Sequence, residues 1–223
     1  MESIDKTIIE KGIKEISENK ESKEFIGTVE IKNFENCNII NNEKLVQYLD
    51  ETIPLSHLEK CPSIEYDPNL KNGMLGSYEY KNHEIHIGDE NRFSNTEKIL
   101  DITTHEIGHN TYDILVEKNK ELSDKWAQLY DESNNKSDGT GFVSELSKIR
   151  KEEDFAESYM AYIRDPEKLQ FMNIDKYEFM RDYIFTGKEY HPSIFAYWDY
   201  DSWGTKIEID HTGIYDLRGN KIG

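Results

Sequence analysis

The sequence has few basic residues, few cysteines and no long apolar run. Its 223 residues include 27 Lys and Arg against 45 Asp and Glu, which gives a formal net charge of −18. A chain this acidic repels a phosphate backbone, so we expect no nucleic acid partner and favour a cationic or neutral peptide. A membrane-spanning helix needs about 20 apolar residues, and no stretch comes close, so we also expect no membrane span.

The two cysteines, Cys37 and Cys61, are too few for a disulfide framework and too widely spaced for a zinc knuckle. We interpret them as buried thiols without a function, and a bridge between them is the alternative if the protein is exported. Residues 1–6 carry no apolar segment of a signal peptide. Either the protein acts where it is made, or this is a mature form whose leader has been removed. Both interpretations stay open.

One short motif organises the expectations about function: His105-Glu106-Ile107-Gly108-His109, which reads H-E-x-x-H. On a helix, residues i and i+4 share a face, so His105 and His109 can point at one metal ion, and imidazole nitrogen suits zinc. Glu106 lies beside the first ligand and can take a proton from a water that the metal activates. The motif predicts one Zn²⁺ ion and a zinc peptidase.

The surroundings of the motif favour a largely buried helix. Residues 94–97 (Ser-Asn-Thr-Glu) form a capping box, which predicts that a helix begins there. Apolar residues flank the motif on both sides: Ile99, Leu100, Ile102, Ile107, Ile114, Leu115 and Val116. Burying two His and a Glu on a helix is costly unless these side chains are paired, and binding of a metal ion would compensate for that cost.

A catalytic zinc site needs a third protein ligand, and a second acidic segment offers one. Residues 152–159 (Glu-Glu-Asp-Phe-Ala-Glu-Ser-Tyr) begin a predicted helix that ends before Asp165-Pro166. Glu153 and Glu157 lie one turn apart, so one can bind zinc while the other holds a ligating His through its second ring nitrogen. A solvated acidic face is the alternative interpretation, and the H-E-x-x-H motif argues against it.

The two motifs together resemble the catalytic domain of the anthrax lethal factor family, which includes small secreted Pro-Pro endopeptidases. That family carries H-E-x-G-H followed by a helix with E-x-F-A-E, here residues 105–109 and 153–157, and the resemblance covers roughly residues 74–185. It implies a gluzincin-type zinc endopeptidase, with Glu153 as the third ligand and Glu157 beside a ligating His. It also implies secretion; a cytoplasmic protein or an injected effector is the alternative.

The sequence departs from the family at one position. The family has a Tyr seven residues before the ligand Glu, where its hydroxyl assists the oxyanion, and this sequence has Leu146 there. Another side chain is then needed as the oxyanion donor. The candidates are Tyr112, Tyr130, Tyr159, Tyr190 and His86, and the sequence leaves the choice open.

Residues 76–88 predict a β-hairpin that turns near residues 81 and 82. Its second arm alternates Ile85 and Ile87 with Glu84 and His86, as a strand with one buried face does. We predict that the hairpin lines the cleft and that an extended substrate pairs with it; an ordinary edge strand is the alternative. The predicted substrate contacts are Tyr80, His83, Glu84 and His86. We expect the two histidines to line the cleft or face solvent rather than bind metal.

The remaining patterns predict a mixture of helices and strands. Helices are expected over residues 4–20, 41–55, 122–130 and 169–185, strands over 25–34 and 63–66, a polar loop over 131–141 and a terminal β-hairpin over 206–222. An aromatic run over residues 190–203 is expected to pack in the core or over the zinc domain, and peptide recognition is its alternative role.

We therefore expect an α+β, zincin-like metallopeptidase domain with a small mixed sheet, an edge strand over the cleft, an active-site helix and a mainly helical C-terminal half. Its parts are an N-terminal α/β part (1–73), a zinc peptidase core (74–190) and a C-terminal aromatic and β extension (191–223). The expected substrate is a protein or peptide, and the protein is expected to be a monomer.

Three alternative functions share part of this pattern. An intracellular regulatory protease of the ImmA/IrrE type also carries H-E-x-G-H, but the downstream E-x-F-A-E favours the lethal factor resemblance. A non-catalytic, zinc-containing peptide-binding module is supported only by Leu146 in the place of the family Tyr. Peptide deformylase needs a Cys ligand in a Gly-rich motif, and neither Cys37 nor Cys61 has that setting.

Overall fold

The computed structural model describes residues 24–89, 93, 95–136, 140–190, 198–200 and 206–208. The predicted helix over residues 4–20 and most of the C-terminal extension lie outside these residues. The described chain is α+β, as predicted, with a five-stranded mixed sheet followed by a mainly helical half. It divides into two compact units, Met1–Ile114 and Leu115–Gly223. The division into functional parts at residues 73 and 190 stays a prediction.

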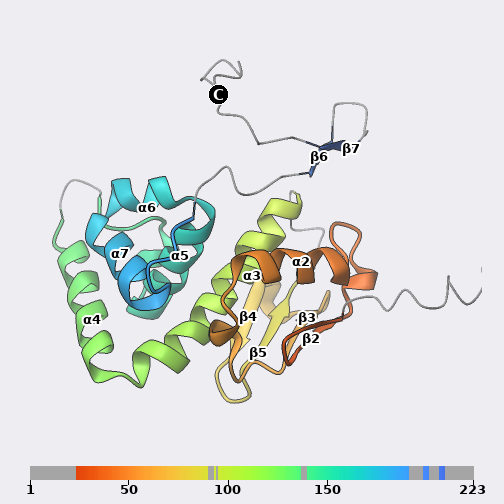
Figure 1. Cartoon of the computed structure of the whole chain (residues 1–223), viewed down its shortest axis with the longest axis horizontal. Helices are drawn as coiled ribbons and strands as arrows, with labels where there is room; N and C mark the ends of the chain where they lie inside the picture. The colour runs from red at the N-terminus through yellow and green to blue at the C-terminus, as the bar shows by residue number, and fades with distance from the viewer. Residues whose placement is uncertain are drawn as a thin grey trace, which may run out of the picture. The chain divides into compact units, whose positions relative to one another are not determined.

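The first unit is built around the mixed sheet. Its strands are β1 (Phe25–Ile26), β2 (Val29–Lys32), β3 (Ser63–Tyr66), β4 (Gly76–Glu79) and β5 (Glu84–Ile87), in the order β1-β2-β3-β5-β4. β2, β3 and β5 are parallel, whereas β1 and β4 are antiparallel to their neighbours. β4 is therefore an edge strand, and β5 lies inside the sheet (Figure 1).

One face of this sheet is apolar and is covered by helices. Alternate residues of the inner strands, among them Ile31, Ile64 and Ile85, are buried, as the two-residue period of a strand requires. α2 (Asn42–Thr52) packs against β1 and β2, and α3 (Thr96–Thr111) packs against β4 and β5 (Figure 1). The sheet thereby positions α3, the helix that carries the H-E-x-x-H motif.

The second unit is a group of helices packed around α5 (Lys151–Arg164). α4 (Lys120–Asn134), α6 (Pro166–Met172) and α7 (Ile174–Phe179) all contact α5 (Figure 1). α5 has the predicted packing face, because Phe155, Tyr159 and Tyr162 are fully buried. The predicted helix over residues 122–130 is confirmed as part of α4, with Trp126 fully buried.

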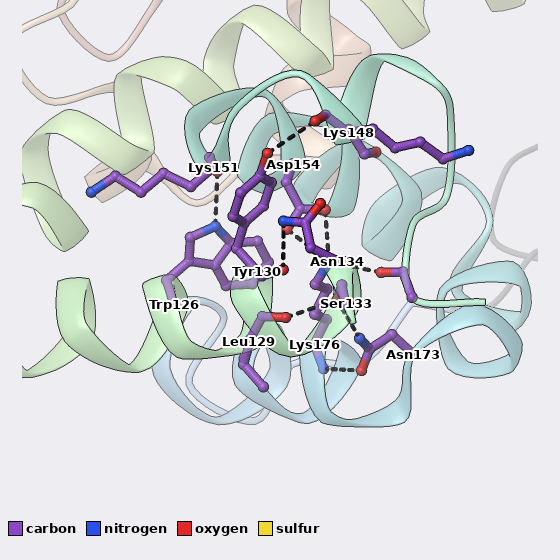
Figure 2. Close-up of polar contacts among 12 residues, drawn as sticks. Trp126, Leu129, Tyr130, Ser133, Asn134, Lys148, Lys151, Asp154, Asn173 and Lys176 are labelled. Atoms are coloured by element: carbon purple, nitrogen blue, oxygen red, sulfur yellow. Dashed lines mark hydrogen bonds and ion pairs between the residues drawn. The ribbon is translucent and has the colours of Figure 1, made fainter. Parts of the chain in front are cut away.

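A buried polar network connects the helices of the second unit (Figure 2). Lys176 Nζ lies 2.7 Å from Asp154 Oδ2, and both side chains are almost completely buried. The same Nζ donates to the backbone oxygen of Gly141 at 2.7 Å, and Trp126 Nε1 donates to that of Lys151 at 2.9 Å. Burial raises the pKa of Asp154 to about 7, although Lys176 opposes this shift, and burial lowers the pKa of Lys176.

Two predicted elements are wrong because single residues interrupt them. Of the residues expected to form one strand over 25–34, residues 25–32 form the hairpin β1–β2, because Gly27 adopts a φ of 59° in the turn between the strands, and Phe34 begins a 3-10 helix. Residues 169–185 do not form one helix, because Asn173 has extended backbone and ends α6. Its side chain then accepts the backbone N–H groups of Asp175 and Lys176 and so caps α7.

Other predicted elements are confirmed or shifted. The helix expected over residues 41–55 is α2, and the strand at 63–66 is β3. The polar loop begins later than predicted, since α4 continues to Asn134. At the C-terminus, β7 (Lys206–Glu208) pairs with β6 (Trp198–Tyr200), whereas the predicted partner arm lies outside the described residues.

Both cysteines are buried, and no disulfide bridge joins Cys37 and Cys61. Burial raises the pKa of the Cys61 thiol to about 12, which keeps this thiol protonated. Among the described residues, no helix is both long enough and apolar enough to span a membrane.

Candidate metal centre

The helix that carries the motif begins one residue later than the capping box predicts. α3 starts at Thr96, and the side chain of Asn95 accepts the backbone N–H of Lys98 at 3.1 Å. Asn95 is therefore the capping residue. The predicted cap, Ser94, lies outside the described residues.

Neighbouring residues fix the rotation of α3. Thr104 Oγ1 lies 2.6 Å from the hydroxyl of Tyr48 on α2. Asn110 Nδ2 donates to the backbone oxygen of His57 at 2.8 Å. Because these buried hydrogen bonds hold one side of α3, they also set the direction in which His105 and His109 project.

The motif side chains converge on one point. The Nε2 atoms of His105 and His109 lie 3.1 Å apart, with their rings almost perpendicular at 82°. Two nitrogens bound at about 2.0–2.1 Å to a tetrahedral zinc ion would lie about 3.3 Å apart, so this pair fits such an ion. A Glu106 carboxylate oxygen completes a group whose ligand atoms all lie within 4.8 Å of one another. This buried group could bind a metal ion.

Glu106 is packed against the edge strand β4. Only 6% of the residue is exposed, and a Cβ added to Gly76 would lie 2.6 Å from its Oε1. Gly76 therefore allows the strand and the carboxylate to approach more closely than any other residue would. A buried carboxylate is costly without compensating positive charge, and a metal ion beside it would supply that charge.

Next to His109 lies a group formed by Tyr78, His83 and Asp113, which we call the Tyr78 cluster. The Tyr78 hydroxyl lies 3.1 Å from Asp113 Oδ2 and 2.6 Å from His83 Nδ1. Burial raises the pKa of Tyr78 well above its usual value, and the charge of Asp113 raises it further. The hydroxyl therefore stays protonated and donates a hydrogen bond to Asp113. The Tyr78 ring stacks on the His109 ring, with centroids 6.4 Å apart and planes 12° apart.

Comparisons with protein-family models, curated proteins and solved structures found no match. The resemblance to the lethal factor family accordingly rests on the two sequence motifs and stays a prediction. Of these, the arrangement of His105, Glu106 and His109 on one buried helix is observed directly.

The predicted substrate contacts lie in the hairpin, but not on its edge strand. Glu84 and His86 belong to β5, which pairs with β3 on one side and β4 on the other. The second arm of the hairpin is therefore an inner strand, and among the described strands β4 lies at this edge of the sheet. Tyr80 lies in the turn and is 58% exposed, whereas His83 is part of the Tyr78 cluster. Contact of these four residues with substrate stays a prediction.

A second group of possible ligands lies on the hairpin. Atoms of Glu79, Glu84 and His86 also lie within 4.8 Å of one another, but Glu79 is exposed and the other two are half-exposed. Exposed carboxylates face water at little cost and need no ion for compensation. The buried group on α3 is thus the stronger candidate.

The other predicted site residues belong to the second unit. Glu153 and Glu157 lie on α5, where Glu153 Oε1 accepts a hydrogen bond from Arg150 at 2.6 Å and Glu157 is buried. Leu146 is 40% exposed in a short 3-10 helix, Leu146–Lys148. The metal role of Glu153, the supporting role of Glu157 and the choice of an oxyanion donor stay predictions.

Three residues next to the motif were missed by the sequence analysis: Gly76, Tyr78 and Asp113. A signal existed for Asp113, which follows His109 by one helical turn and so shares its face. Gly76 and Tyr78 had no comparable signal. They meet α3 only because β4 occupies the edge of the sheet beside this helix.

Proposed function

We propose that this protein is a zinc-dependent endopeptidase of the gluzincin type, with a peptide or protein as its substrate. The convergence of the His105 and His109 Nε2 atoms beside the buried Glu106 carboxylate carries this proposal. Bound there, zinc would polarise the scissile carbonyl and lower the pKa of a water molecule toward 7. By resemblance, Glu153 is the third ligand and Glu157 orients a ligating His.

Glu106 is the proposed general base. It lies next to His105 in sequence, and its carboxylate is close to both ligand nitrogens. In this role it takes the proton of the attacking water and later delivers it to the leaving amine. Packing against Gly76 restricts the carboxylate to few orientations, which suits a group that must receive and return one proton.

The outer edge of β4 is the proposed binding surface for an extended substrate. Gly88 N donates to Leu75 O at 2.8 Å, so these residues form a hydrogen-bonded pair of the β4–β5 ladder. In antiparallel strands, hydrogen-bonded pairs alternate with pairs that are not hydrogen-bonded, so Ser77 and His86 form the next hydrogen-bonded pair. The backbone N–H and C=O groups of Gly76 and Tyr78 consequently point away from β5. A peptide that pairs with them would run beside Glu106 and His109.

This function is tested by measuring zinc content and peptide cleavage in three proteins: the parent protein and the variants Glu106→Gln and His105→Ala. We expect the parent to bind one zinc ion and to cleave members of a peptide library, read by mass spectrometry, with cleavage abolished by a chelator. Glu106→Gln should keep zinc and lose about 10²–10⁴-fold in turnover, whereas His105→Ala should lose zinc. Near-native turnover of Glu106→Gln would reject Glu106 as the base, and loss of its zinc would make Glu106 a ligand instead.

A peptide-binding module with an inert zinc site is the second candidate. Leu146, in the place of the family's oxyanion Tyr, is the observation that favours it. Tight, zinc-dependent peptide binding without cleavage would support this alternative. Cleavage restricted to one cytosolic repressor would instead favour an intracellular regulatory protease of the ImmA/IrrE type.

A further inference from the structure

The Tyr78 cluster joins the edge strand to the helix that carries the metal ligands. Asp113 is 98% buried and lies one turn after His109, and its Oδ2 faces two groups of the hairpin. The Tyr78 hydroxyl is 3.1 Å from this oxygen, and His83 Nδ1 is 3.2 Å from it. The hydrogen bonds therefore connect β4, the hairpin turn and the π-helix Tyr112–Glu117, which directly follows α3, at a single carboxylate oxygen.

The donors and acceptors of this cluster are assigned from the chemistry of its groups, since a carboxylate oxygen can only accept. The Tyr78 hydroxyl has one proton, which it donates to Asp113 Oδ2. The 2.6 Å contact between the Tyr78 oxygen and His83 Nδ1 then requires His83 Nδ1–H as the donor. Tyr78 is thus held at its outer end by one hydrogen bond given and one received, which leaves the ring little freedom to rotate or tilt.

The ring that is held in this way lies nearly parallel to the ring of a proposed metal ligand, with centroids 6.4 Å apart. The planes of Tyr78 and His109 differ by 12°, whereas those of His105 and His109 differ by 82°. A parallel neighbour limits rotation of the His109 ring about its bond to Cβ. That rotation decides whether His109 Nε2 points to the place where an ion bound by His105 Nε2 would lie.

We propose that Tyr78 is a positioning residue that orients the His109 imidazole for metal binding, with Asp113 and His83 as its anchors. This inference rests on the proposed metal function of His105 and His109. It assigns to Tyr78 no contact with the reacting atoms, because its hydroxyl is already bound to Asp113 and His83. The same bonds argue against Tyr78 as the missing oxyanion donor.

Metal binding by two variants of Tyr78 separates the role of the ring from that of its anchor. Tyr78→Leu removes both, whereas Tyr78→Phe keeps the ring against His109 and removes only the hydroxyl. Ser77→Leu is the matched control, because it places the same side chain on the same strand but on the opposite face of the sheet. Zinc affinity is measured by competition with a chromophoric chelator, and ligand geometry by the visible spectrum of the Co²⁺-substituted protein.

Removing a group that orients a metal ligand typically costs about 10–100-fold in metal affinity. We expect Tyr78→Leu to fall in this range with an altered Co²⁺ spectrum, Tyr78→Phe to lose less, and Ser77→Leu to match the parent. Circular dichroism and thermal unfolding of the metal-free proteins establish that each variant is folded. If Tyr78→Leu fails to fold, the comparison of Tyr78→Phe with the parent decides: a weaker zinc affinity supports the inference, and an unchanged affinity and spectrum overturn it.

The outcomes also separate this inference from the proposed function. A parent protein that binds neither zinc nor Co²⁺ would overturn both. A parent that binds zinc, together with a folded Tyr78→Leu of equal affinity and spectrum, would overturn only the positioning role. An equal loss in Tyr78→Leu and Ser77→Leu would do the same, because the effect would then come from disturbance of β4 rather than from the ring.

Discussion

Gly76 of β4 and Glu106 of α3 pack so closely that no side chain fits between them. A Cβ on Gly76 would lie 2.6 Å from Glu106 Oε1 and 2.6 Å from Ile102 Cγ2, well inside van der Waals contact. The first unit therefore brings an edge strand directly against the candidate base. This contact connects two features that the sequence shows separately, a hairpin and an H-E-x-x-H motif.

Gly76→Ala tests the importance of this close approach. The added methyl group must displace either the Glu106 side chain or β4, and such overpacking costs about 1–3 kcal/mol in the free energy of unfolding. We expect zinc content to be unchanged and peptide hydrolysis to fall at least about tenfold, since Glu106 would no longer face the water. Ser77→Ala is the control on the same strand. Full activity of Gly76→Ala would show that Glu106 does not need its observed position.

The identity of the third ligand is tested by the zinc content of purified Glu153→Ala and Glu157→Ala after dialysis against a mild chelator. Loss of a direct ligand should strip zinc, while loss of a residue that orients a ligand should cost about 10–100-fold in affinity. We expect the larger loss in Glu153→Ala. Glu152→Ala is the control, because Glu152 lies on a different face of the same turn of α5.

The reverse order of zinc loss would make Glu157 the ligand and would weaken the resemblance to the lethal factor family. Full retention of zinc in both variants would mean that neither residue is the third ligand and that the acidic face of α5 is an ordinary solvated one. The ion pair of Glu153 with Arg150 offers a further control: Arg150→Ala should leave zinc bound if Arg150 only neutralises the metal-free carboxylate.

Substrate binding along β4 is testable with ester analogues of a cleaved peptide. Replacing one substrate N–H by an ester oxygen, at a residue that pairs with Gly76 or Tyr78, removes one hydrogen bond worth about 0.5–1.5 kcal/mol. We expect KM to rise about 2–10-fold for that analogue and to stay constant when the replaced N–H points away from β4. Equal KM values for both analogues would contradict pairing at this edge.

Proline substitutions in β5 should destabilise the protein more than proline in an edge strand would, because β5 is paired on both sides. Ile85→Pro removes an N–H from a strand that is paired on both sides and places a ring in the core of the sheet. We expect a loss of about 3 kcal/mol or more in the free energy of unfolding, measured with urea. A stable, fully folded Ile85→Pro would show that β5 is not the inner strand.

The buried pair Asp154–Lys176 should make the second unit sensitive to both charge and pH (Figure 2). Lys176→Met leaves Asp154 without its cation, and removal of one partner of a buried pair costs about 3–5 kcal/mol. The folded-state pKa of Asp154, about 7, lies above its usual value of 3.8, so its contribution to stability is present below pH 3.8 and is lost as pH rises through 7.

The loss caused by Lys176→Met should accordingly be larger at pH 8 than at pH 5, because at pH 5 the variant can keep Asp154 protonated. Urea unfolding at both pH values measures this difference. The double variant Asp154→Leu/Lys176→Met should recover much of the stability, since it leaves no buried charge. A pH-independent loss in the single variant would mean that Lys176 acts mainly through the cation–π contact of its Nζ with the Phe142 ring.

Elements with a strong local pattern were predictable from the sequence. The positions of β3, of the β4–β5 hairpin and of α5 follow from alternation, turn residues and Asp165-Pro166, all within short stretches of chain. The convergence of His105 and His109 was predictable for the same reason, because 3.6 residues per turn place them on one face of any helix. Errors occurred where one residue overrides such a pattern, as Gly27 and Asn173 do.

By itself, then, the sequence determined the candidate ligands His105 and His109, the candidate base Glu106 and the helix that presents them. Only the tertiary structure decided that β4 is the edge strand, that Gly76 lies against Glu106, and that Tyr78 links His109 to Asp113 and His83. The physical reason is the range of the interactions. Helix geometry is set by residues three or four apart, whereas strand order and side-chain packing join residues that are distant in the chain, and no local pattern encodes which of them meet.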